Sequence, residues 1–123
     1  MASDVFMIKV DNGDSDKIMA QKLNALIDAS GVLGFLKKDD YTGIKIHFGE
    51  EGNTGHIKAE WLKGLVERLR SVTNNIFFTD TNVLYKQSKR TNAVDHLKLA
   101  YSHGFGFQNI NVPVIIADGL WGR

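Results

Sequence analysis

The sequence contains no cysteine and only one proline among its 123 residues. Without cysteine the chain forms no disulfide, has no thiolate nucleophile and supplies no thiolate ligand for a metal or an iron–sulfur cluster. The formal net charge of +1 gives no general electrostatic reason to expect binding to nucleic acid or to a membrane surface. No apolar run approaches the roughly 20 residues of a membrane span, and no basic leader opens the chain. These absences predict a cytoplasmic protein without nucleic-acid or membrane partners.

The composition that is present is typical of a globular protein. Hydrophobic residues make up 43% and charged residues 24% of the chain, both close to ordinary averages. The length suits one domain with a real core, so we predict a single α/β domain over residues 1–123. The apolar run at 112–117 is followed by only a short turn. This ending favours either an edge strand or a fragment of a longer protein.

Four short runs rich in strand-forming residues divide the chain. They are Val5–Val10, Tyr41–Phe48, Ile76–Thr79 and Pro113–Ala117. Apolar residues at helical spacing separate these runs, in helices predicted to begin at Ser15 or Asp16, near Ile57 and at Asn92. A short extended piece is predicted over Asn109–Val112, before the last strand. The alternation predicts a three-layer α/β fold, an open and mostly parallel sheet of about four strands with helices on both faces.

Polar residues gather where the predicted strands end. The four groups are Asp11, Asn12 and Asp14; His47, Glu50 and Asn53; Thr79, Asp80, Thr81 and Asn82; and Asp118. Because the carboxyl ends of parallel strands meet at one edge of a sheet, where ligands bind, we expect these groups to converge on one site. Asp and Asn are also ordinary turn residues, so turn chemistry alone is an open alternative.

Lys45 and His47 share one face of the second predicted strand. Burying either side chain without a partner would cost free energy or shift its pKa, so each needs a partner or solvent. One interpretation is a strand at the edge of the sheet, with Lys45 reaching solvent. The other directs both side chains toward the ligand edge, where Asp80 would pair with them.

The functional interpretation assigns a role to each residue of this edge. His47 and Asp80 form the predicted catalytic pair. The predicted substrate-binding residues, which orient or neutralise a small anionic ligand, are Lys45, Asn53, Asn82 and Arg90. Glu50 and Asp118 are predicted ligands of a divalent metal ion, because such ions prefer oxygen donors. The glycine-rich segment after the second strand is neither a P-loop nor a dinucleotide fingerprint, so no nucleotide is predicted.

Three segments carry a resemblance to a known family. Lys45–Gly55, the run from Thr79 to Tyr85 continued by Asn92–His96, and Pro113–Gly119 resemble domain-of-unknown-function family 362, described as uncharacterised iron–sulfur-centre proteins. The resemblance covers most of the chain from Tyr41 onward. It implies the N-terminal part of a longer protein that carries a ferredoxin-like segment with two four-iron four-sulfur clusters. Because this chain has no cysteine, we expect a cluster only in a longer form, and the family supplies no reaction to transfer.

Two functions therefore stay open. The first is a ligand- or metal-binding domain of a redox-associated protein, with its polar site at the carboxyl ends of the strands. The second is a non-catalytic module that docks an electron-transfer domain or a partner subunit, with the sheet edge around 112–117 as part of the interface.

Overall fold

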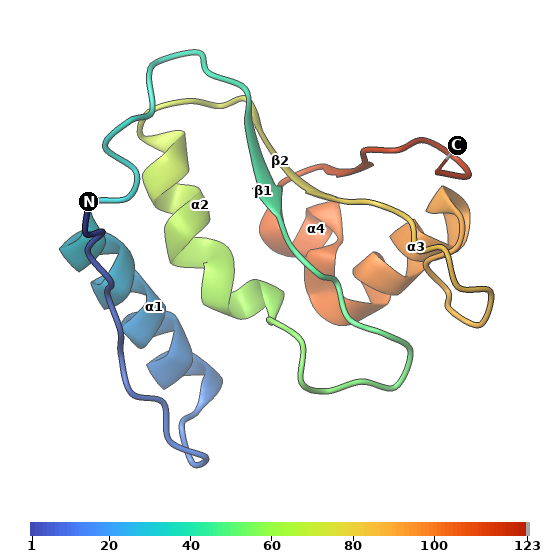
Figure 1. The fold of residues 1–123 in the computed structure, drawn as a ribbon, viewed down its shortest axis with the longest axis horizontal. Helices are drawn as coiled ribbons and strands as arrows, with labels where there is room; N and C mark the ends of the chain where they lie inside the picture. Colours follow the sequence, from blue (N-terminus) through green and yellow to red (C-terminus); the bar gives the residue numbers. More distant parts are fainter. Residues whose placement is uncertain (123) are drawn as a thin grey trace.

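Three parallel strands form an open sheet at the centre of the computed structural model, which describes residues 1–122 (Figure 1). In sheet order they are β1 (Thr42–Lys45), β2 (Ile76–Asp80) and β3 (Val114–Ile116). Each falls within, or within one residue of, a run that the sequence predicted as a strand. The predicted α/β class and the open, parallel sheet are confirmed, with three strands rather than about four.

Helices connect the strands and pack against the sheet. They are α1 (Asp16–Ser30), the 3₁₀ turn η1 (Ala59–Leu62), α2 (Lys63–Arg70), α3 (Ala93–Ala100), the π-helical turn η2 (Tyr101–Phe105) and α4 (Phe107–Ile110). Two predicted N-caps are confirmed: Ser15 accepts a hydrogen bond from the backbone of Ile18, and Asn92 from that of Asp95. Within residues 1–122 no helix is both long and apolar enough to cross a membrane.

The prediction of a strand at Val5–Val10 is wrong. The segment runs beside α1 (Figure 1) and belongs to no sheet. Strand propensity alone does not make a strand, because the backbone groups need a neighbouring strand to pair with. No strand of the described residues lies next to this segment, so its backbone stays unpaired.

The predicted extended piece at Asn109–Val112 is also wrong in part. Phe107–Ile110 forms the single turn of α4, which ends where Asn111 takes a left-handed conformation (φ 54°). Asparagine tolerates this conformation better than most residues, so the turn can stop there and the chain can enter β3.

The core centres on three phenylalanine rings from distant parts of the chain. Phe48, Phe78 and Phe105 are each 0% exposed. Phe105 packs edge-on against both other rings, with centroid distances of 5.0 Å to Phe48 and 5.4 Å to Phe78. This contact ties η2 to β2 and to the segment that leaves β1, and so positions the loops at the carboxyl ends of these strands.

The two faces of the sheet are covered unequally. Ile76 and Phe78 of β2 point into the core formed with α2, η2 and α4. On the opposite face Lys45 of β1 and Ile115 of β3 are exposed. The helical cover predicted for both faces is therefore incomplete on the Lys45 face within residues 1–122.

Replacing Phe105 by alanine should destabilise the fold by about 3 to 5 kcal/mol, because it removes a fully buried ring and leaves a cavity. The matched control is Phe107→Ala, which removes a ring that is 60% exposed and should cost less than about 1 kcal/mol. Chemical denaturation followed by circular dichroism measures both free energies of unfolding. Equal losses for the two variants would contradict this description of the core.

Candidate functional site

A buried arginine lies at the carboxyl ends of β1 and β2. Arg90, in the connection between β2 and α3, is 5% exposed. Its Nε and Nη2 atoms donate to Oε1 of Glu50, at 2.8 and 2.6 Å. Its Nη1 donates to Oδ2 of Asp80, at 3.4 Å. The guanidinium group therefore joins the loop after β1 to the end of β2, and a buried charge of this kind is stable only with such partners.

Glu50 receives two further hydrogen bonds. The Tyr85 hydroxyl donates to Oε1 at 2.6 Å and the Ser88 hydroxyl to Oε2 at 2.8 Å. Burial raises the pKa of the Glu50 carboxyl, but these hydrogen bonds and those from Arg90 outweigh it and lower the pKa from 4.5 to about 2. Glu50 therefore holds the β2–α3 connection in place as a permanent anion.

Asp80 has three basic neighbours. Besides Arg90 these are Lys45, whose Nζ lies 3.3 Å from Oδ1, and His96, whose Nε2 lies 3.8 Å from Oδ2. His96 is 0% exposed, and neither ring nitrogen has a hydrogen-bond partner among the described residues. Burial is the main effect on the pKa of His96 and lowers it, while Asp80 acts in the opposite direction. His96 is thus a neutral ring on α3, behind the Asp80 carboxylate.

Asn82 and Asp118 form a second polar contact at this edge. The Asp118 carboxylate accepts hydrogen bonds from the backbone N–H of Asn82, at 2.9 and 3.1 Å, and from its side-chain amide, at 3.1 Å. The same amide donates to the carbonyl of Gly119 at 2.9 Å. This contact ties the chain after β2 to the chain after β3.

His47 and Asn53 lie in the same region but bond locally. Nδ1 of His47 accepts a hydrogen bond from the backbone N–H of Gly49 at 3.0 Å. The side-chain oxygen of Asn53 accepts one from Gly55 at 2.6 Å. No hydrogen bond or ion pair within residues 1–122 joins His47 to Asp80. The structure therefore brings together four of the eight predicted site residues, Lys45, Glu50, Asp80 and Arg90, and separately pairs Asn82 with Asp118.

A pair of stacked histidines packs against the start of the loop after β1. The rings of His56 and His103 lie 4.2 Å apart, nearly parallel. Nδ1 of His103 lies 2.7 Å from the carbonyl of Phe48, which can only accept, so this nitrogen donates and Nε2 is the acceptor of the neutral ring. Burial is the main cause of the lowered pKa of His56, and the nearby His103 adds to it. Nothing in the spacing of His103 along the sequence relates it to the loop after β1, so sequence reasoning missed this contact.

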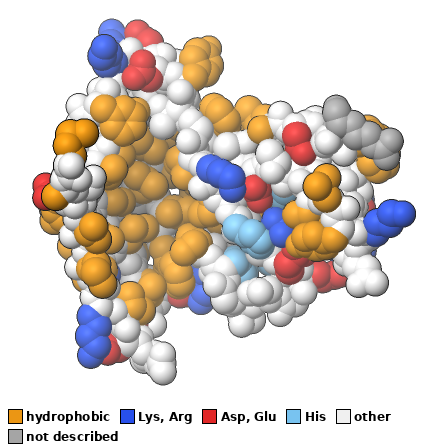
Figure 2. All heavy atoms as spheres, in the orientation of Figure 1, with side chains coloured by type: hydrophobic (Ala, Val, Ile, Leu, Met, Phe, Trp, Pro, Cys, Tyr) orange, Lys and Arg blue, Asp and Glu red, His pale blue; other side chains and the backbone are white. Residues whose placement is uncertain are grey.

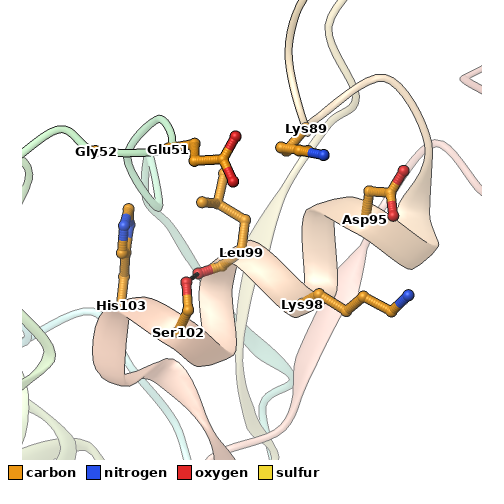
Figure 3. A pocket seen from close by; sticks show the side chains of 8 residues that line it. All are labelled: Glu51, Gly52, Lys89, Asp95, Lys98, Leu99, Ser102 and His103. Carbon is orange, nitrogen blue, oxygen red and sulfur yellow. Dashed lines mark hydrogen bonds between the residues drawn. The ribbon is translucent and has the colours of Figure 1, made fainter.

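An open hollow of about 430 Å³ lies between that loop, the β2–α3 connection and α3 (Figure 3). Its polar lining residues are Glu51, Lys89, Asp95, Lys98, Ser102 and His103. Figure 3 shows Lys89 between Glu51 and Asp95, with its nitrogen end on the side of Asp95. The Ser102 hydroxyl donates to the carbonyl of Leu99 at 2.7 Å and keeps its oxygen as an acceptor. Sequence reasoning missed this set because α3 and η2 bring four of its members in from a distance along the chain.

The predicted metal ligands Glu50 and Asp118 lie in different contacts. Arg90 and Tyr85 bond to Glu50, and Asn82 bonds to Asp118. Within residues 1–122 no three histidine or carboxylate side chains are placed to hold a metal ion together.

Comparison with known proteins adds no relative. No protein-family model, no curated protein and no solved structure matches this chain.

Glu50→Gln should lower stability at pH 7 by about 1 to 3 kcal/mol, since the buried guanidinium loses the closer of its two anionic partners. The folded pKa of Glu50 lies below its unfolded value, so its stabilisation is present above about pH 4.5 and is lost as the pH falls toward 2. The variant should therefore lose less stability than the wild type over this range. Urea unfolding at several pH values measures it, with Glu60→Gln, an exposed glutamate paired with Lys63, as the control. Parallel acid profiles for wild type and Glu50→Gln would disprove this role.

Gly49→Ala should destabilise the chain more than Gly52→Ala does. Both glycines have positive φ, 94° and 75°, so alanine pays a backbone cost of about 1 to 2 kcal/mol at either position. A Cβ at Gly49 would also lie 2.7 Å from Nδ1 of His103 and 2.9 Å from Cγ of His56, whereas a Cβ at Gly52 meets no atom within 4 Å. Thermal unfolding of the two variants separates crowding from backbone strain. Similar melting temperatures would show that His56 and His103 move aside without a measurable cost.

Proposed function

We propose that this chain is a ligand-binding α/β domain that holds a small molecule with an anionic group at the carboxyl ends of β1 and β2. The observation that carries the proposal is the pair of lysines in the hollow. Lys89 and Lys98 both line it, and neither forms an ion pair within residues 1–122. Ammonium groups that are not held in an ion pair are available to bind a phosphate or a carboxylate.

The other groups of the hollow favour a ligand with hydrogen-bond donors as well. The carboxylates of Glu51 and Asp95 can accept from hydroxyl or amino groups, and Ser102 adds a hydroxyl oxygen. The volume of about 430 Å³ lies within the range of small-molecule sites. The ligand class is therefore a small polar metabolite with one anionic end.

The Glu50–Arg90 pair joins the two loops that form this site. Glu50 immediately precedes Glu51, and Arg90 immediately follows Lys89. The strong hydrogen bonds between Glu50 and Arg90 thus hold the two loops that carry Glu51 and Lys89. Asp80 and Lys45 complete this support rather than touch the ligand in the hollow.

The proposal includes an acid–base group for any chemistry at the site. His103 lines the hollow and presents Nε2 as a hydrogen-bond acceptor. Two predictions from the sequence stay proposals for this edge of the sheet. One is a catalytic pair of His47 and Asp80, and the other is metal binding by Glu50 and Asp118.

The wider setting rests on the resemblance to family 362. It supports a cytoplasmic, redox-associated protein whose longer form carries the four-iron four-sulfur clusters in a ferredoxin-like segment. A docking module is the second candidate function. The observation that favours it is the open edge at β3, where Ile115 is 48% exposed and available for contact with such a segment.

Titration with inorganic phosphate tests the proposed ligand class. The amide resonances of Lys89, Lys98 and Ser102 should shift in ¹H–¹⁵N NMR spectra as phosphate is added, and Lys89→Ala or Lys98→Ala should each weaken binding about tenfold, the size expected for one charged hydrogen bond. Lys38→Ala is the matched control, since Lys38 belongs to neither loop and does not line the hollow.

Two results would overturn the proposal. One is the absence of saturable shifts with phosphate and also with acetate or malate, the carboxylate probes. The other is an equal loss of affinity in Lys38→Ala, which would indicate unspecific attraction to a positive surface.

A further inference from the structure

The chain exposes more surface than a folded monomer of its mass should. Its accessible area is 8299 Å², whereas a compact monomer of 13.7 kDa exposes about 6,600 Å². The surplus of about 1,700 Å² equals what one subunit of a large, permanent complex buries, about 1,000 to 2,500 Å². The molecule therefore carries surface of the kind and amount that another polypeptide covers.

The free edge of β1 is one part of this surface. In the register of the sheet, Thr42 and Ile46 donate to β2, through the carbonyls of Asn75 and Thr79. The N–H and C=O groups of Gly43 and Lys45 consequently point the other way, to the side where the described residues supply no strand. Unpaired groups of this kind are a template for strand addition.

An apolar groove of about 460 Å³ runs along this edge. Figure 2 shows it as a hollow of hydrophobic side chains between the rim of the molecule and its centre. Its walls include Ile8 and Val10 of the N-terminal segment, Met19 and Leu23 of α1, Ile44 of β1 and Ile46 directly after it. Lys22, the charged residue of the α1 wall, is neutralised by Asp14 at 2.5 Å. An extended apolar segment is the occupant that suits both the groove and the strand edge.

The chain itself contains such a segment. Val5–Val10 carries apolar residues on both faces, with Lys9 as its one charged residue. Phe6 and Ile8 are 45% and 40% exposed, while Val5 and Met7 are 80% and 88% exposed. Its backbone forms no hydrogen bond to other backbone groups within residues 1–122. The segment thus has the composition of a buried strand and lacks a sheet.

We propose that two copies of this chain associate by exchanging these segments, so that Val5–Val10 of each copy takes the place of the other's own segment at the apolar groove and pairs with its Gly43–Lys45 edge. With two-fold symmetry, each copy's Val5–Val10 segment pairs with the β1 edge of the other copy and covers its groove. No unpaired segment is then left to add a third copy, so the assembly stops at a dimer. The net charge of +1 leaves little repulsion between two copies. The association uses a different surface from the proposed ligand site, which lies beyond the carboxyl ends of the strands.

Light scattering after size-exclusion chromatography tests the proposal on the full chain. The wild type should elute at twice 13.7 kDa, and Met7→Lys should raise the dimer dissociation constant about a hundredfold, because it buries an ammonium group at the interface. Met7 is free in the monomer, so the variant should keep its fold. Leu84→Lys is the matched control, since Leu84 is 96% exposed and lies in the β2–α3 connection, and it should leave the dimer intact.

Hydrogen exchange locates the interface. The amides of Gly43 and Lys45 should exchange slowly in the wild-type dimer and rapidly in Met7→Lys, because strand pairing is what protects them. A wild type that is monomeric at every concentration would overturn the proposal. So would a dimer that Met7→Lys leaves unchanged, or slow exchange at Gly43 and Lys45 in a monomer, which would show that the chain's own segment closes the edge.

Discussion

The buried guanidinium of Arg90 between two carboxylates is the interaction on which the polar edge of this sheet depends. Arg90, in the β2–α3 connection, donates to Glu50 in the loop after β1 and to Asp80, the last residue of β2. Removing any of the three leaves a charge without its partner in a desolvated place, which proteins tolerate poorly. The loops after β1 and β2 are therefore fixed to each other, and the hollow between them keeps its shape before any ligand arrives.

Elsewhere the molecule leaves apolar side chains exposed and a strand edge unpaired. The side chains of Val5 and Met7 are free, the β1 edge is unpaired, and Ile115 on the Lys45 face is half-exposed. Apolar groups left in water forgo the main favourable term of folding, about 25 cal/mol for each Å². Association with another polypeptide would bury such surface. The strands of a parallel sheet are normally covered on both faces and paired on both sides, which is why this sheet leaves surface to cover.

Much of this arrangement could be predicted from the sequence, and the failures have one physical cause. Local patterns located β1, β2, β3, the helix caps at Ser15 and Asn92, and the convergence of Glu50 and Asp80. The outcomes that the sequence did not reveal depend on a distant neighbour. Val5–Val10 has the composition of a strand, but no strand of the described residues pairs with it. His103 joins the loop after β1 only because the π-helical turn η2 returns it there, and no spacing in the sequence marks that return.

One strand connects the polar edge with the open one. The side chain of Lys45 contacts Asp80 in the Arg90 network, while the backbone of the same residue faces the free edge of β1. Pairing of that edge would restrict β1 in the stretch that leads directly to Glu50. Because Glu50 holds the loop beside the hollow, ordering of β1 lowers the entropy that a ligand would otherwise have to remove. The proposed dimer and the proposed ligand site are thus distinct surfaces that share one structural support.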